Sequence, residues 1–149
     1  MKKLFAALLA IVIFSTPQLA AASDPLAGLI GQKRVLLLFA RSRSDANLDR
    51  QLDVLSEQRT EISERKLVVI SVAGNSDGVT AIGYASLASG SGRQLQKRFM
   101  PAVFGLTVVL IGLDGAEQAR WQHSIEPKII FDLIDAEPLP DATAPAVVN

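Results

Sequence analysis

The run from Arg41 to Ser44 is the stretch whose residue types are best suited to binding, since it joins a dense apolar segment to a helical pattern. A helix N-terminus presents free backbone N–H groups and a partial positive charge, and guanidinium groups hold carboxylates, sulfates or phosphates. We therefore take Arg41, Ser42, Arg43 and Ser44 as a candidate site for a small anion or a protein partner. The alternative is a solvated loop with a serine cap, because no glycine-rich cradle is present.

Two other positions are weaker candidates for chemistry. His123 is the single histidine and lies beside Ser124, but adjacent residues rarely reach the geometry of a base and its nucleophile. Asp114-Gly115 lacks the further oxygen ligands of a calcium loop, and this pair favours a tight hairpin turn. We predict no catalytic residue, no metal site and no cofactor.

The chain has no cysteine. This excludes thiol catalysis, thiol–disulfide exchange and thiolate metal sites. A single histidine also excludes a multi-histidine zinc site within one chain.

The N-terminus has the pattern of a cleavable signal peptide. Lys2 and Lys3 precede an apolar run from Leu4 to Phe14, and small residues follow at Ala20 to Ala22. The run is shorter than the about 20 residues that span a bilayer, so we expect cleavage after Ala22 and no membrane span in the mature chain. The signal peptide is thus 1–22, and the protein is predicted to be periplasmic or secreted.

The rest of the chain has the size of a single domain, which we place at 23–140. Without Lys2 and Lys3 it has 13 basic and 15 acidic residues, and this balance argues against nucleic acid as a partner. Residues 141–149 are expected to form a disordered tail, because the end of the chain is rich in proline and poor in large apolar residues.

Four segments have the pattern of strands. Three are dense apolar runs without alternation, which is typical of strands covered on both faces. The fourth follows the Asp114-Gly115 turn and alternates, with Ala119 and Trp121 on one face, as at a sheet edge. The four are Val35–Ala40, Leu67–Ala73, Thr107–Ile111 and Gln118–Gln122.

Helical spacing marks about 45–65, 93–99 and 127–136. The first of these helices is expected to be capped by Ser42 or Ser44, and the last to pack through Ile130, Leu133 and Ile134. Residues 74–92, rich in glycine, serine and alanine, are expected to form a long loop with a short hairpin or helical turn.

The order β-α-β-α-β-β-α predicts an α/β fold of the thioredoxin-like kind, with a central mixed sheet and helices on both faces. In that fold a redox Cys-x-x-Cys follows the first strand, where this chain has Arg41 to Ala46. The slot of the cis-proline before the third strand is taken by Leu106. Thioredoxin, glutaredoxin and peroxiredoxin activities are therefore not expected, whatever the fold.

Four stretches together resemble a known group of domains: KRVLLLFARSRSDANLDRQLDVL, ERKLVVISV, GLTVVLIGLDGAEQARW and IIFDLIDAEPLP. They are similar to the bacterial P-DUDES-type domains of unknown function, which are related to domains in animal extracellular sushi-repeat and coiled-coil-domain-containing proteins. The resemblance covers about Gly31 to Pro140 and implies a thioredoxin-like fold without an assigned activity. The chain departs from that pattern at Leu113, where a lysine is frequent, and at Glu137 to Pro140, where a Met-Pro-Met-Arg-like run is frequent.

These observations favour an exported, non-catalytic thioredoxin-like domain that binds a protein partner or a small anion. One alternative is an enzyme that uses non-thiol chemistry at the loop after the first strand. Another is a structural envelope subunit that docks through its edge strand. A deep pocket with convergent polar groups near Arg41 would support a ligand or catalytic site, and a flat surface would support an interaction module.

Overall fold

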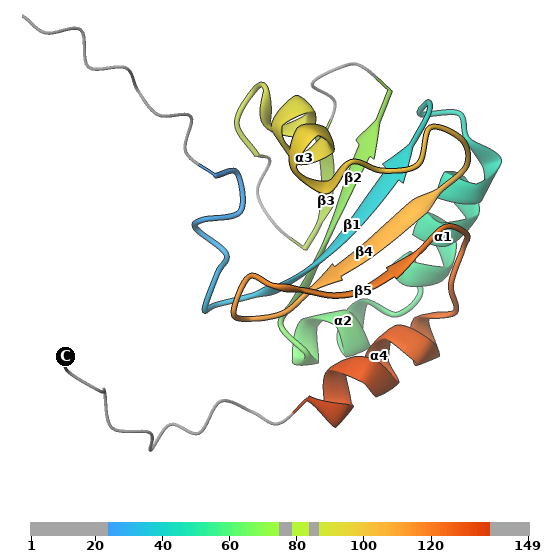
Figure 1. The fold of residues 1–149 in the computed structure, drawn as a ribbon. Helices are drawn as coiled ribbons and strands as arrows, with labels where there is room; N and C mark the ends of the chain where they lie inside the picture. Colours follow the sequence, from blue (N-terminus) through green and yellow to red (C-terminus); the bar gives the residue numbers. More distant parts are fainter. Residues whose placement is uncertain (1–23, 75–78, 84–86, 138–149) are drawn as a thin grey trace, which may run out of the picture.

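The computed structural model describes residues 24–74, 79–83 and 87–137 (Figure 1). The predicted signal peptide at 1–22 and the predicted tail at 141–149 lie outside the described residues. Within the described ranges, no helix combines the length and the apolar character that a membrane crossing requires.

One mixed sheet forms the centre of the molecule, in the strand order β3-β2-β1-β4-β5. β1 pairs in parallel with β2, and the other neighbours pair antiparallel. Every residue of β1, β2 and β4 is buried, as the apolar runs predicted. The strands are β1 (Arg34–Ala40), β2 (Leu67–Ala73), β3 (Val79–Ile82), β4 (Thr107–Ile111) and β5 (Glu117–Trp121).

Helices cover both faces of this sheet, as Figure 1 shows. Because strand side chains alternate, Leu36 and Leu38 join one core cluster while Leu37 and Phe39 join the other. The first cluster packs against α1 (Ala46–Ser56), α2 (Arg59–Glu64) and α4 (Pro127–Ala136). The second packs against α3 (Ser91–Phe99) and the turns at 24–33.

The single helix predicted for about 45–65 is two helices. α1 ends at Ser56 with Glu57 as its C-cap, and Gln58, the N-cap of α2, has φ −103° and ψ 30°, outside helical geometry. Leu55 of α1 and Ile62 of α2 both enter the same core cluster.

The predicted packing face of α4 is partly wrong. Ile130 and Ile134 are buried as expected, but Leu133 is 40% exposed and Phe131 is 7% exposed. Successive helical residues turn by about 100°, so 130, 131 and 134 share one face while 133 lies at its margin.

Near the sheet edges the strand positions also differ slightly from prediction. β3 lies in the stretch predicted to be a loop with a short hairpin, and it extends the sheet beyond β2. β5 begins one residue earlier than expected, and a register shift at Leu110 and Ile111 accommodates it. Ala119 and Trp121 pack on the core as the alternation predicted. The Asp114-Gly115 pair forms the expected turn, with Gly115 at φ +80°.

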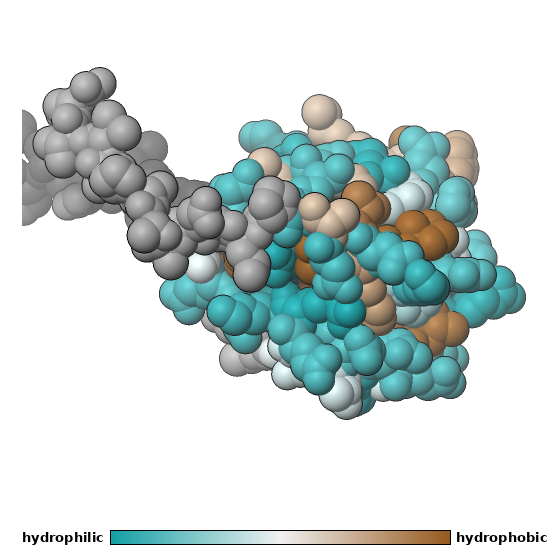
Figure 2. Space-filling view, turned by 90° about the horizontal axis from the view of Figure 1, so that it is seen from below, coloured by the Kyte–Doolittle hydropathy of each residue, from teal (hydrophilic) through white to brown (hydrophobic). Residues whose placement is uncertain are grey.

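Seen from below, the surface is mainly hydrophilic with separate hydrophobic spots (Figure 2).

Candidate functional site

The loop from Arg41 to Ser44 is exposed at all four residues and leads from β1 into α1. Its serines do not cap the helix, which corrects the expectation for Ser42 and Ser44. The carboxylate of Asp45 accepts hydrogen bonds from the backbone N–H groups of Asn47 (2.9 Å) and Leu48 (3.4 Å). A carboxylate competes better than a hydroxyl for these donors because it carries charge that the helix dipole stabilises.

This cap changes where an anion can bind. The first-turn donors that the sequence suggested for an external anion are already used by Asp45. A second anion there would also meet the negative charge of that carboxylate. The helix N-terminus is therefore a poor anion site, and any role of Arg41 must lie on the other side of the loop.

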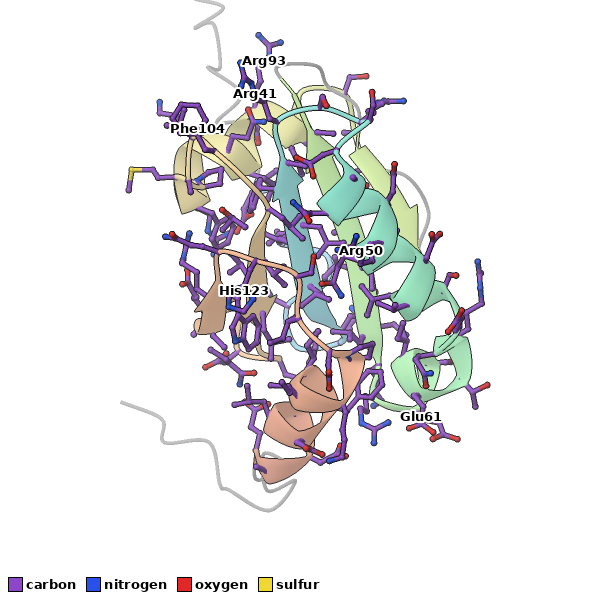
Figure 3. All side chains as sticks on the ribbon, turned by 90° about the vertical axis from the view of Figure 1, so that its right-hand side faces the viewer. Arg41, Arg50, Glu61, Arg93, Phe104 and His123 are labelled. Atoms are coloured by element: carbon purple, nitrogen blue, oxygen red, sulfur yellow. The ribbon has the colours of Figure 1, made fainter. Side chains whose placement is uncertain are left out.

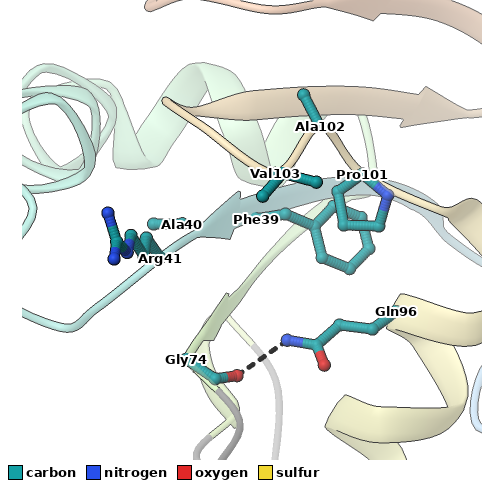
Figure 4. A pocket seen from close by; sticks show the side chains of 8 residues that line it. All are labelled: Phe39, Ala40, Arg41, Gly74, Gln96, Pro101, Ala102 and Val103. Atoms are coloured by element: carbon teal, nitrogen blue, oxygen red, sulfur yellow. Dashed lines mark hydrogen bonds between the residues drawn. The ribbon is translucent and has the colours of Figure 1, made fainter.

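A depression of about 430 Å³ lies on that side, at the carboxyl ends of β1 and β2 (Figure 4). Among the described residues, the predicted loop contributes Arg41 alone to its lining. The other walls come from the end of β1, the residue after β2, one side chain of α3 and the loop before β4. The lining residues are Phe39, Ala40, Arg41, Gly74, Gln96, Pro101, Ala102 and Val103.

Backbone contacts fix the wall formed by Gly74. Its N–H donates to the carbonyl of Ala40 (3.0 Å), and its carbonyl accepts from Nε2 of Gln96 (2.7 Å). Gly74 has φ +67°, and a Cβ at this position would lie 3.3 Å from the carbonyl oxygen of Arg41. Both the dihedral angle and the close approach favour glycine, which lets β1 and β2 end side by side.

The opposite wall is the segment Met100–Gly105, here called the apolar loop. Met100 adopts φ +41° as α3 ends, and Gly105 adopts φ +81° before β4. The N–H of Ala102 donates to Oγ1 of buried Thr107 (3.1 Å), which holds the loop against the sheet. Met100, Val103 and Phe104 are nonetheless 79%, 79% and 76% exposed.

Arg41, which lines the depression, also contacts Phe104 of the apolar loop. The guanidinium carbon of Arg41 lies 6.0 Å from the centroid of the Phe104 ring, within the range of a cation–π contact. Figure 3 shows Arg41, Arg93 and Phe104 at the same end of the molecule. The structure thus joins one predicted site residue, Arg41, to an apolar loop that lies outside the site predicted from sequence. The signal available was the run of apolar residues between Pro101 and Gly105, which fits neither a helix nor a strand.

His123 takes no part in this site. Figure 3 places it well away from Arg41, and its Nδ1 lies 2.8 Å from the carbonyl oxygen of Ser124. The hydroxyl of Ser124 donates to the carbonyl of Asn47 (3.4 Å), not to the imidazole. Both contacts agree with the expected exposed loop histidine. Among the described residues, no group of three His, Asp or Glu side chains is placed to hold a metal ion.

A second depression, of about 460 Å³, lies between α2 and α4. Its central residue, Arg65, donates to both carboxylate oxygens of Asp135 (2.9 and 2.7 Å) and to Glu61, and it lies 4.7 Å above the ring of Phe131. These hydrogen bonds lower the pKa of Asp135 and raise that of Arg65. The contacts of Arg65 are thus made within the protein, and they join α2 to α4.

A family model described as "Domain of unknown function (DUF4174)" matches residues 25–142. No curated protein matches the chain.

Solved structures share the fold at low sequence identity. A reduced 2-Cys peroxiredoxin of Plasmodium vivax has a TM-score of 0.56 at 19% identity, over 74% of this chain and 68% of that one. Thioredoxin peroxidase I of Plasmodium yoelii has a TM-score of 0.55 at 19% identity, over 74% and 76% of the two chains. The mitochondrial 2-Cys peroxiredoxin of Plasmodium falciparum has a TM-score of 0.50 at 13% identity, over 74% and 78%. These similarities confirm the predicted thioredoxin-like α/β fold, which this chain adopts without a cysteine.

Proposed function

The chain belongs to the DUF4174 family of domains of unknown function, and we propose that it is an exported binding domain that works without thiol chemistry. Export is supported by the charged, apolar and small-residue order of residues 1–22. On this proposal the mature protein acts in the periplasm or outside a bacterial cell. The likeness of its sequence to P-DUDES-type domains, and through them to animal extracellular sushi-repeat proteins, is in keeping with such a location.

Binding is assigned to the depression beside Arg41, where the ligand is a small anion or an anionic group of a protein partner. The observation that carries this assignment is the Arg41 guanidinium at the rim of a cavity of about 430 Å³, a size typical of ligand sites. The lining residues that the structure describes include no acidic side chain. An anion placed there would meet a positive charge without an opposing carboxylate from those residues.

The described lining supports binding over catalysis. Its polar side chains are the guanidinium of Arg41 and the amide of Gln96, which already donates to Gly74. Neither group is a general base or a nucleophile at neutral pH. An enzyme at this position would need a group that these side chains do not supply.

Thermal unfolding with phosphate, sulfate or acetate, at constant ionic strength, tests the assignment. We expect these anions to raise the unfolding midpoint of the wild-type protein but not that of Arg41→Ala. Arg43→Ala and Arg59→Ala should respond like the wild type, because neither residue lines the depression. An equal response of all four proteins would indicate general salting-out and would contradict an anion site at Arg41.

A further inference from the structure

We propose that the occupant of this site is an extended peptide segment of a partner protein that carries a carboxylate next to a large apolar side chain. The inference rests on the proposed function and specifies its ligand. It follows from three features: an exposed apolar loop, a layer of the fold with more basic than acidic residues, and a depression lined by Arg41.

The apolar loop is the strongest exposed hydrophobic feature of the described residues. Met100, Val103 and Phe104 are each more than three quarters exposed, whereas Ile30, Ile129 and Leu133 are 40–43% exposed. The backbone of the loop is nonetheless held in place, because Ala102 donates a hydrogen bond to Thr107 and Leu106 is buried. Contiguous exposed apolar side chains on a fixed backbone are typical of an interaction surface.

Charge separates across the sheet. Residues 24–33 and α3, on one face of the sheet, contain four basic residues and one acidic residue, Asp24. Asp24 pairs with Arg98, so the excess positive charge of this layer comes from Lys33, Arg93 and Lys97. In contrast, residues 45–65 and 126–137, which form the opposite layer, contain ten acidic and four basic residues. The face with the apolar loop therefore complements an acidic ligand, although the whole chain has a formal net charge of zero.

The contact between Arg41 and Phe104 sets how far apart the carboxylate and the apolar side chain of the ligand can be. A guanidinium over an aromatic ring keeps its planar N–H donors available for a carboxylate. Phe104 and Val103 offer apolar surface directly beside it, and Val103 also lines the depression. A ligand that uses both must carry its acidic and apolar groups as close neighbours, as in consecutive or alternating residues of an extended peptide.

The concave shape favours a peptide over a lipid surface. A bilayer interface takes up apolar side chains that project from a surface, but it cannot fill a hollow behind them. Here the hollow lies between the apolar loop and the end of β2, with the ring of Phe39 and the side chain of Gln96 in its lining (Figure 4). A single side chain of a bound peptide can enter it.

The test is selection from a displayed library of random linear peptides on the purified, immobilised protein, with counter-selection on an Arg41→Ala, Phe104→Ala variant. We expect enriched peptides to pair Asp or Glu with Leu, Ile, Phe or Met. Binding of a synthetic enriched peptide should weaken about 5-fold or more on Arg41→Ala and on Phe104→Ala, as at a binding hot spot. Arg59→Ala and Ile129→Ser, which change an exposed cation and an exposed apolar residue in the opposite layer, should bind like the wild type.

The other outcomes each overturn the inference. Enrichment of basic or purely apolar peptides, or of peptides that bind both immobilised proteins alike, contradicts the specified chemistry. Sedimentation with phosphatidylglycerol vesicles that Phe104→Ala abolishes, without peptide enrichment, assigns the apolar loop to a membrane. Self-association that Arg41→Ala abolishes assigns it to a second copy. If no peptide is enriched while phosphate or acetate still stabilises the protein through Arg41, the proposed anion site stands and only this inference fails.

Discussion

Gln51 and Ile125 exchange two hydrogen bonds across 74 positions of sequence. Nε2 of Gln51 donates to the carbonyl of Ile125 (2.9 Å), and the N–H of Ile125 donates to Oε1 of Gln51 (2.7 Å). Gln51 is fully buried on α1, and Ile125 precedes α4. One amide thus satisfies both backbone groups of a buried segment and sets where α4 begins relative to α1.

Replacement of Gln51 by leucine should destabilise the protein strongly. The variant leaves the N–H and the C=O of Ile125 buried without partners, and we expect it to lower the free energy of unfolding by about 2–4 kcal/mol. Urea denaturation measures this change. Gln122→Leu, at an exposed position, is the matched control and should change stability by less than about 0.5 kcal/mol. Equal losses of unfolding free energy in the two variants would show that the hydrogen bonds between Gln51 and Ile125 do not stabilise the fold.

Truncation of a buried and of a partly exposed leucine to alanine should lower the free energy of unfolding by different amounts. Leu37 is fully buried in the central strand, so Leu37→Ala should cost about 2–4 kcal/mol through lost burial and a cavity. Leu133→Ala should cost about 1 kcal/mol or less, because its side chain is already 40% exposed. Denaturation of the two variants in parallel checks the ranking, and a larger loss at Leu133 would refute its position at the margin of the packing face of α4.

Acid should weaken the link between α2 and α4. Hydrogen bonds from Arg65, next to α2, hold the pKa of Asp135 in α4 below its usual value. Within β5, a hydrogen bond from Arg120 lowers the pKa of Glu117 in the same way. A carboxyl group with a depressed folded-state pKa stabilises the protein above its unfolded-state pKa, and this contribution is lost as pH falls through the folded-state value. Asp135→Asn should therefore be less stable than the wild type at pH 7, and the difference should shrink below about pH 4.

A double-mutant cycle at these positions provides the control. In an Arg65→Ala background, Asp135→Asn should have little further effect at pH 7, because the partner of the carboxylate is absent. Urea denaturation over a pH series measures all four proteins. A stability difference between the wild type and Asp135→Asn that stays constant from pH 7 down to pH 2 would contradict the assigned cause.

Expression of the full chain in a Gram-negative bacterium should yield a mature protein that begins at or near Ser23. The expected cause is cleavage after the small residues Ala20 to Ala22. Intact mass and N-terminal sequencing of the periplasmic or secreted fraction measure the outcome. A protein that keeps Met1 and stays in the membrane fraction would contradict export as a cleaved domain.

The three central strands could be predicted from sequence, because a strand buried on both faces is a run of mostly apolar residues. β1, β2 and β4 consist mostly of apolar residues, and their observed bounds lie within one residue of the predicted ones. The break at Gln58 and the exposure of Leu133 differ from the prediction, because the spacing of apolar residues indicates a helical face but not where a helix breaks or where that face ends. Gln51 and Arg34 are buried polar residues whose hydrogen-bond partners, Ile125 and Glu137, lie far along the chain. The local pattern of apolar residues carries no information about such distant pairs.

The candidate site could be predicted only in part. The position of Arg41 after the first strand predicts its place at the site, whereas the cap of α1 is Asp45 and not the predicted Ser42 or Ser44. The other walls come from Gly74, Gln96 and the apolar loop, which approach Arg41 only when β1 and β2 lie side by side. The pairing of the strands brings these residues together, so no short sequence motif predicts the site.

The uneven distribution of charge across the sheet should affect how the protein is oriented when it approaches an acidic partner. The mature chain proposed here has 13 basic and 15 acidic residues, so its net charge does not attract a distant acidic partner, but the opposite charges of its two layers give it a dipole moment. An approaching acidic surface would rotate the molecule until α3 and the apolar loop face it. Added salt should then slow association chiefly by making collisions less often correctly oriented, while the rate of dissociation changes much less.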